Sequence, residues 1–154
     1  MKQCYKTGDF KLYFIENMQA LHLPIPSTYF DSYNMAIANA MVMIETLKSL
    51  GSGATVAELI GATIGLEKLK IAAAFGAAAY VGATIGSIAV ASGRSLGCGS
   101  RIVDMFSFLE QEKLTFPGWR QFYFHTPEIF NKNHPQRKML AIKMRSFPTH
   151  FEYS

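Results

Sequence analysis

The residues best suited to covalent chemistry are one cysteine and three histidines in the second half of the chain. Cys98 lies in the glycine-rich stretch LGCGSR, and His125, His134 and His150 follow it. A thiol beside an imidazole is the pair that a cysteine nucleophile requires. No motif fixes these residues relative to one another, so a soluble enzyme using Cys98 stays an alternative and no catalytic residue is predicted.

Cofactor chemistry has no signature either. The four histidines, which include His22, lack metal-ligand spacing. The stretch GRSLGCGS at 93–100 has glycines and an arginine, but not the order G-x-x-x-x-G-K-[ST] that cradles phosphate. We expect no enzyme, no metal and no cofactor. Cys4 and Cys98 are the only cysteines, and whether they pair stays open.

The C-terminal region, residues 115–154, combines aromatic and basic side chains. One stretch without any acidic residue contains Lys132, Arg137, Lys138, Lys143 and Arg145. Such a cluster suits the headgroups of an anionic membrane, and Trp119 and Tyr123 suit the same interface. Interleaved aromatics and cations also stack single-stranded nucleic acid. They are more often core aromatics with solvated charges, so nucleic acid is not an expected partner.

The elements that position these residues form a single domain, residues 1–154. The chain is 49% hydrophobic and 17% charged, against about 25% charged in typical soluble proteins. The N-terminal MKQCYKTGDFKLYF has no uninterrupted apolar segment, because Lys6, Asp9 and Lys11 break it. It does not resemble a secretory signal. We expect synthesis in the cytoplasm without a signal peptide, and a dedicated carrier if the protein acts elsewhere.

Two helices are predicted before the centre of the chain. Residues 10–23 form a short helix that places Leu12, Ile15, Met18 and His22 at helical spacing. Residues 27–50 form an amphipathic helix that Ser27 can cap. Its apolar stripe is Ile37, Ala38, Met41, Val42 and Ile44. Glu45 and Lys48 form an i,i+3 pair away from that stripe.

Two further regions follow the centre. Residues 100–114 form an amphipathic helix with Ile102, Met105, Phe106 and Leu109 on one face. In the region 115–154, FPGW is typical of a turn, and TPE is typical of a helix start with proline in the first position.

The centre of the chain, residues 54–99, is rich in glycine and alanine. Residues 71–92 form a run of 22 residues with no charge. As a helix this run spans about 33 Å, and a bilayer core is about 30 Å thick. Its six strongly apolar residues contribute only about 2 to 4 kcal/mol to insertion. The run is therefore a marginal membrane helix, and a buried core helix is the alternative.

Glycine spacing in this region predicts close helix packing. The motif GATIG occurs twice, at 61–65 and 82–86. On a helix, Gly82, Gly86, Gly93 and Gly97 lie within about 60° of one another. Small residues four apart let helix backbones approach closely. The glycines expected at packing faces are Gly61, Gly65, Gly76, Gly82, Gly86, Gly93 and Gly97.

These elements predict a mainly α-helical, compact domain. Residues 54–66 and 71–92 form a central apolar hairpin around the charged corner 67–70. The amphipathic helices 27–50 and 100–114 wrap the hairpin in water. On a membrane we expect this outer layer to open and the hairpin to insert.

Over residues 50–100 the glycine pattern resembles that of small glycine-zipper, pore-forming antibacterial toxins, including cargo effectors of type VI secretion. The resemblance implies a protein that forms a homo-oligomeric pore and depolarises the inner membrane of a target cell. It implies membrane lipid, a secretion-system carrier or chaperone, and a cognate immunity protein as partners. The alternatives are a small non-toxic membrane or accessory protein, and a soluble enzyme or binding domain with a buried Ala/Gly helix.

Overall fold

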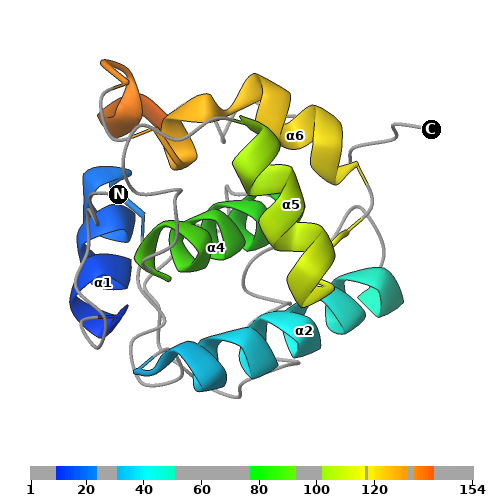
Figure 1. Ribbon diagram of the computed structural model, residues 1–154. Coiled ribbons are helices and arrows are strands. Elements are labelled where there is room, and N and C mark those ends of the chain that lie inside the picture. The colour runs from blue at the N-terminus through cyan, green and yellow to red at the C-terminus, as the bar shows by residue number, and fades with distance from the viewer. Residues whose placement is uncertain are drawn as a thin grey trace.

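The glycine- and alanine-rich helix lies at the centre of the fold, and the other helices pack around it (Figure 1). In this computed structural model the described residues are 10–23, 31–50, 77–92, 102–116, 118–131 and 134–140. They form five α-helices and two short 3-10 helices, and no β-strand occurs within these ranges. The predicted mainly α-helical compact fold is therefore confirmed.

The central helix, α4, spans Ala77–Ala91. Alanine has the highest helix propensity, and no proline interrupts the segment. Every residue from Ala79 to Ala91 is buried, which an uncharged helix tolerates because it has no charged face to solvate. The helix ends where the Ser92 hydroxyl donates to the carbonyl of Ala89 at 2.7 Å. In the part of the chain that the structure describes, no helix combines the length and apolar character needed to cross a bilayer.

The other parts of the predicted hairpin cannot be compared in the same way. The first arm at 54–66, the charged corner at 67–70 and the first six residues of the uncharged run at 71–76 lie outside the described residues. The hairpin itself therefore stays a prediction, whereas the wrapping of α4 by other helices is observed.

Helix α1 spans Phe10–Ala20, within the predicted helix at 10–23 but ending three residues earlier, and it presents a different face to the core. Of the residues at the predicted spacing only Met18 is fully buried, whereas Leu12 is 58% exposed and His22 is exposed. The face that meets α4 instead carries Phe10, Phe14, Asn17, Met18 and Leu21. The prediction of the inward face was wrong because the two phenylalanines, one turn apart, bury more apolar surface than leucine and isoleucine.

Helices α1 and α5 (Ile102–Glu112) end in the same way. His22 and Lys113 have positive φ angles of 58° and 59°. The amide of the next residue, Leu23 or Leu114, donates back to a carbonyl five residues earlier. Both leucines are buried. This is a Schellman ending, in which a left-handed residue turns the chain and the following apolar residue packs against the helix.

Helix α2 spans Tyr33–Leu50 and packs on α4. It begins later than predicted, and the Ser32 hydroxyl accepts from the amide of Met35 at 3.2 Å. The predicted cap, Ser27, lies outside the described residues. The predicted stripe was wrong for most of its length. Ile44 is buried, but Met41 and Val42 are 39% and 45% exposed. The buried residues are Ala36, Ala40, Met43, Ile44 and Leu47. The predicted pair of Glu45 and Lys48 is present at 3.7 Å.

The last described elements are α5, α6 (Trp119–His125) and the 3-10 helices η3 (Pro127–Ile129) and η4 (Arg137–Met139). On α5, Met105 and Leu109 are buried as predicted. The predicted turn before α6 is present, since the amide of Trp119 donates to the carbonyl of Phe116 at 3.1 Å. The proline of TPE opens η3 as predicted, but the Thr126 hydroxyl donates back to the carbonyl of Phe122 at 2.7 Å.

Candidate functional site: the glycine face of the central helix

The glycine face of α4, formed by Gly82 and Gly86, is filled by side chains from the C-terminal third of the chain. A Cβ atom built on Gly82 would lie 2.3 Å from Cε2 of Phe122, and one built on Gly86 would lie 2.2 Å from Cγ2 of Ile129. Distances this short are overlaps, so each glycine leaves a notch that one side chain occupies. We call α6 and η3, which carry Phe122 and Ile129, the cover.

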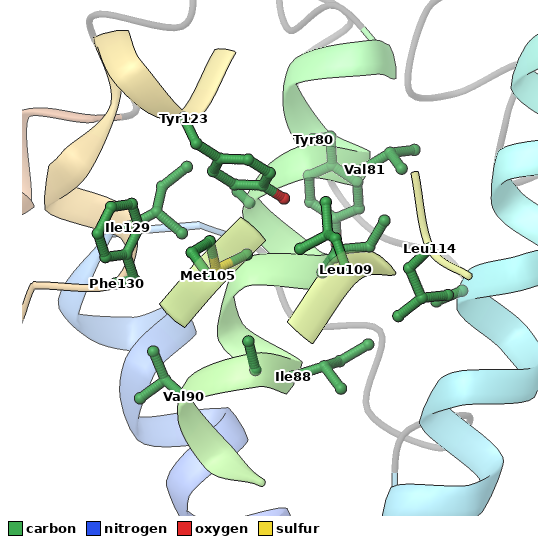
Figure 2. Close-up of a cluster of buried hydrophobic side chains, with 14 of the residues drawn as sticks. Tyr80, Val81, Ile88, Val90, Met105, Leu109, Leu114, Tyr123, Ile129 and Phe130 are labelled. Carbon is green, nitrogen blue, oxygen red and sulfur yellow. The ribbon is translucent and has the colours of Figure 1, made fainter. Parts of the chain in front are cut away.

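A buried hydrogen bond joins the cover to the same face. The hydroxyl of Tyr123 on α6 donates to the carbonyl of Gly82 at 2.7 Å. Figure 2 shows the Tyr123 ring extending from α6 towards α4, with Ile129 beside it. Burial raises the pKa of the Tyr123 phenol well above its usual value of about 10. The phenol therefore stays protonated and remains a donor at physiological pH.

A second polar contact holds η3 from the side of α1. The amide nitrogen of Asn17, a buried residue of α1, donates to the carbonyl of Ile129 at 3.0 Å and to the hydroxyl of Ser87 at 2.8 Å. The Ser87 hydroxyl lies 3.2 Å from the sulfur of Met18. Arg137, the first residue of η4, donates to the side-chain oxygen of Asn17. One amide thus joins α1, α4 and the cover.

Aromatic side chains pack the remainder of the cover against α5. The ring centroid of Trp119 lies 4.9 Å from that of Phe106, in an edge-to-face arrangement. The guanidinium carbon of Arg120 lies 4.4 Å from the centroid of the Trp119 ring. Arg120 also pairs with Glu110 of α5 at 3.6 Å, an exposed ion pair of small energetic weight.

A cleft of about 500 Å³ opens on the outer side of the cover. Its lining residues are Phe124, His125, Pro127, Glu128, His134, Gln136 and Met139. Phe124 is 57% exposed, so one wall of the cleft is apolar and reaches solvent. The structure brings His125 and His134 to this cleft, whereas Cys98 and His150 lie outside the described residues. Among the described residues, no group of three potential ligands could hold a metal ion.

The predicted site residues therefore have several environments. Gly82 and Gly86 pack closely against the cover, and Trp119 and Tyr123 are buried in it. Arg137 is half-buried and Lys138 is exposed. These four aromatic and basic residues are predicted to lie at a membrane interface. Only a membrane-bound form would show this role, so it stays a prediction. Outside the described residues lie Gly61, Gly65, Gly76, Gly93, Gly97, Lys132, Lys143 and Arg145.

The sequence interpretation missed the residues that fill the glycine face. Phe122 and Ile129 lie 40 and 43 residues after the glycines they contact, and no local pattern links them. Asn17 was also missed, although a polar residue on the buried face of an amphipathic helix indicates a specific partner, since buried polar groups are hydrogen-bonded.

No protein-family model, no curated protein and no solved structure matches the chain.

Proposed function

We propose that the protein permeabilises membranes, as a pore-forming antibacterial effector that folds in water before α4 enters the lipid of a target membrane. In this proposal α4 is the membrane-active element, and the surrounding helices keep it out of water. A secretion-system carrier, a cognate immunity protein and a homo-oligomeric pore belong to the same proposal.

The observation that carries this proposal is the burial of α4 on all sides. Its residues Ala77–Ala91 include no charge. Helices α1, α2, α5, α6 and η3 all contact it. Charged residues occur on the surrounding helices instead, as in the pair of Glu110 on α5 and Arg120 on α6. A helix without a charged side chain on any face favours lipid once its neighbours separate.

The size of α4 sets a requirement on this mechanism. Its 15 residues span about 22 Å, less than the roughly 30 Å of a bilayer core. The uncharged sequence continues from Ala77 back to Ile71, so a membrane-bound helix has further apolar residues to recruit. We propose that the inserted helix is longer than α4.

The first experiment measures leakage. Purified full-length protein is added to dye-loaded vesicles of phosphatidylethanolamine and phosphatidylglycerol, and periplasmic expression is followed with a membrane-potential dye. We expect dye release in vitro and depolarisation with growth arrest in vivo. A monodisperse protein that neither binds nor permeabilises these vesicles contradicts the proposal.

The second experiment identifies the inserting helix. The chain has one tryptophan, so Trp119→Phe provides a background for single-tryptophan probes. Tyr80→Trp places the probe on α4, and Val42→Trp places it on the exposed face of α2 as the matched control. Lipids brominated along the acyl chain should quench the α4 probe and leave the α2 probe bright. Substituting leucine at Gly82 is less informative, because leucine would collide with Phe122 before any membrane is met.

A second candidate is a binding domain in which the Ala/Gly helix is purely structural. The cleft beside Phe124 and His134 favours it, because an open, partly apolar cavity of about 500 Å³ has room for a small ligand. Vesicle leakage separates the two candidates, since a binding domain should leave vesicles intact.

A further inference from the structure

We propose that the cover, α6 and η3, is an autoinhibitory element that must leave the glycine face before α4 can enter lipid. This inference rests on the proposed membrane function and adds its control. Two arrangements compete for one surface, the face formed by Gly82 and Gly86.

The glycine face cannot serve two partners at once. In the folded chain, side-chain atoms of Phe122 and Ile129 lie within 2.3 Å of where a Cβ on Gly82 or Gly86 would be. Another helix that packed through these glycines would place its backbone and side chains in the same notches. Covered α4 is therefore unable to associate with a second α4 through this face.

Two polar contacts attach the cover to α4 and α1, and neither donor nor acceptor in them is charged. Tyr123 donates to the carbonyl of Gly82, and Asn17 donates to the carbonyl of Ile129. Both are hydrogen bonds between neutral groups, which contribute less than charged pairs. The residues that fill the notches are a phenylalanine and an isoleucine, and both are apolar side chains that lipid accepts as readily as a protein core does.

The cover is also built from short elements. Helix α6 has seven residues and η3 has three, whereas α2 has 18. Short helices have little stability of their own and depend on packing. Elements with few internal hydrogen bonds open at lower free energy than long core helices. We therefore expect the cover to separate from α4 more easily than α2 does.

The geometry at Gly86 allows a reversible lock. A Cβ built on Gly86 lies 3.6 Å from the Cβ of Ile129, and disulfides join Cβ atoms about 3.5–4.5 Å apart. The volume that Gly86→Cys adds is offset by the volume that Ile129→Cys removes. We therefore design the double variant Gly86→Cys/Ile129→Cys in a background with Cys4→Ser and Cys98→Ser, and confirm the disulfide by mass spectrometry.

Leakage from phosphatidylethanolamine/phosphatidylglycerol vesicles is measured for the oxidised and the reduced variant. The oxidised protein should release dye about tenfold or more slowly, since a disulfide of this loop length strongly favours the closed state. A reductant should restore the rate to that of the background protein. Equal rates in the two states overturn the autoinhibitory role and leave the membrane function standing. If the background protein, which lacks the engineered cysteine pair, also releases no dye, the membrane function is overturned, and the autoinhibitory role with it.

A second pair of variants covers the case in which the cysteine pair fails to fold. Ile129→Ala weakens the cover, and Ile44→Ala removes the same buried side chain from α2. Both should lower the denaturation midpoint, but Ile129→Ala should raise the leakage rate about tenfold more, because only it opens a notch at the glycine face. Leakage rates that follow the denaturation midpoint alone, for both variants, overturn the proposal.

Discussion

Helices α4 and α2 both combine alanine with larger apolar residues, but only α2 has a face that is exposed to solvent. On α4 the notches at Gly82 and Gly86 are filled, and every described side chain is buried. On α2 the small residues Ala36 and Ala40 face the core, whereas Met35, with 42% exposure, faces water. Small size alone does not mark a packed face, since Ala38 of α2 is exposed. What distinguishes α4 is that its glycines leave notches that side chains of other elements fill.

The largest loss of stability is expected when the aromatic ring that fills the notch at Gly82 is removed. Phe122→Ala leaves the space beside Gly82 empty, and the free energy of unfolding should fall by about 3–5 kcal/mol. The matched change on the outer face of α2, Met41→Ala, should stay within about 0.5 kcal/mol. Urea denaturation of both variants measures the difference. Similar losses at the two positions would show that the notch is not a special contact.

The next test fills a notch from the other side. Gly86→Ala should lower the free energy of unfolding by about 1–3 kcal/mol, because the new methyl overlaps Ile129. In an Ile129→Ala background the same change should instead stabilise the protein by up to about 1 kcal/mol, the ordinary helix preference for alanine over glycine. A double-mutant cycle by chemical denaturation measures this reversal. An unchanged sign in the two backgrounds would contradict the close contact.

The hydrogen bond to the glycine face gives a smaller effect with a pH signature. Tyr123→Phe should lower the free energy of unfolding by about 1 kcal/mol at pH 7. The folded-state pKa of Tyr123 is raised, so the unfolded chain loses its proton first, and the wild type loses stability as pH rises above about 10. Its advantage over Tyr123→Phe should therefore shrink by about 1.4 kcal/mol per pH unit there. Denaturation at pH 8 to 11.5 checks this, and a constant difference would contradict the burial of a protonated phenol.

The smallest change in stability is expected on the exposed face of α2, which the comparison places outside the core. Val42→Thr on the outer face of α2 should change the free energy of unfolding by no more than about 0.5 kcal/mol, since this side chain is 45% exposed. Thermal denaturation at two protein concentrations measures it. A larger, concentration-dependent loss would show that this face of α2 is covered by a second copy in solution.

The parts of the fold that could be predicted depend on local composition. The absence of charge in residues 71–92 left a membrane helix and a buried core helix as alternatives, and the described part of this run, α4, is buried. The spacing of Gly82 and Gly86 predicted close approach of helix backbones, whereas the contacts observed are with the side chains of Phe122 and Ile129. The inward face of α2 was misjudged because apolar residues occur nearly all round that helix, so their periodicity does not select one side. The partner of the glycine face was beyond prediction, because Phe122 and Ile129 meet α4 only through tertiary folding, across about 40 residues of chain.

The position of the cover along the chain has a consequence for synthesis. Helices α1 and α2 precede α4, so they have left the ribosome when α4 emerges. The residue that bonds to Gly82 follows it by 41 positions. At about 5–20 residues per second, translation needs about 2–8 s to supply it. During each round of synthesis the glycine face is therefore uncovered for seconds. A nascent-chain chaperone, or a chain on a neighbouring ribosome, can bind it before the cover does.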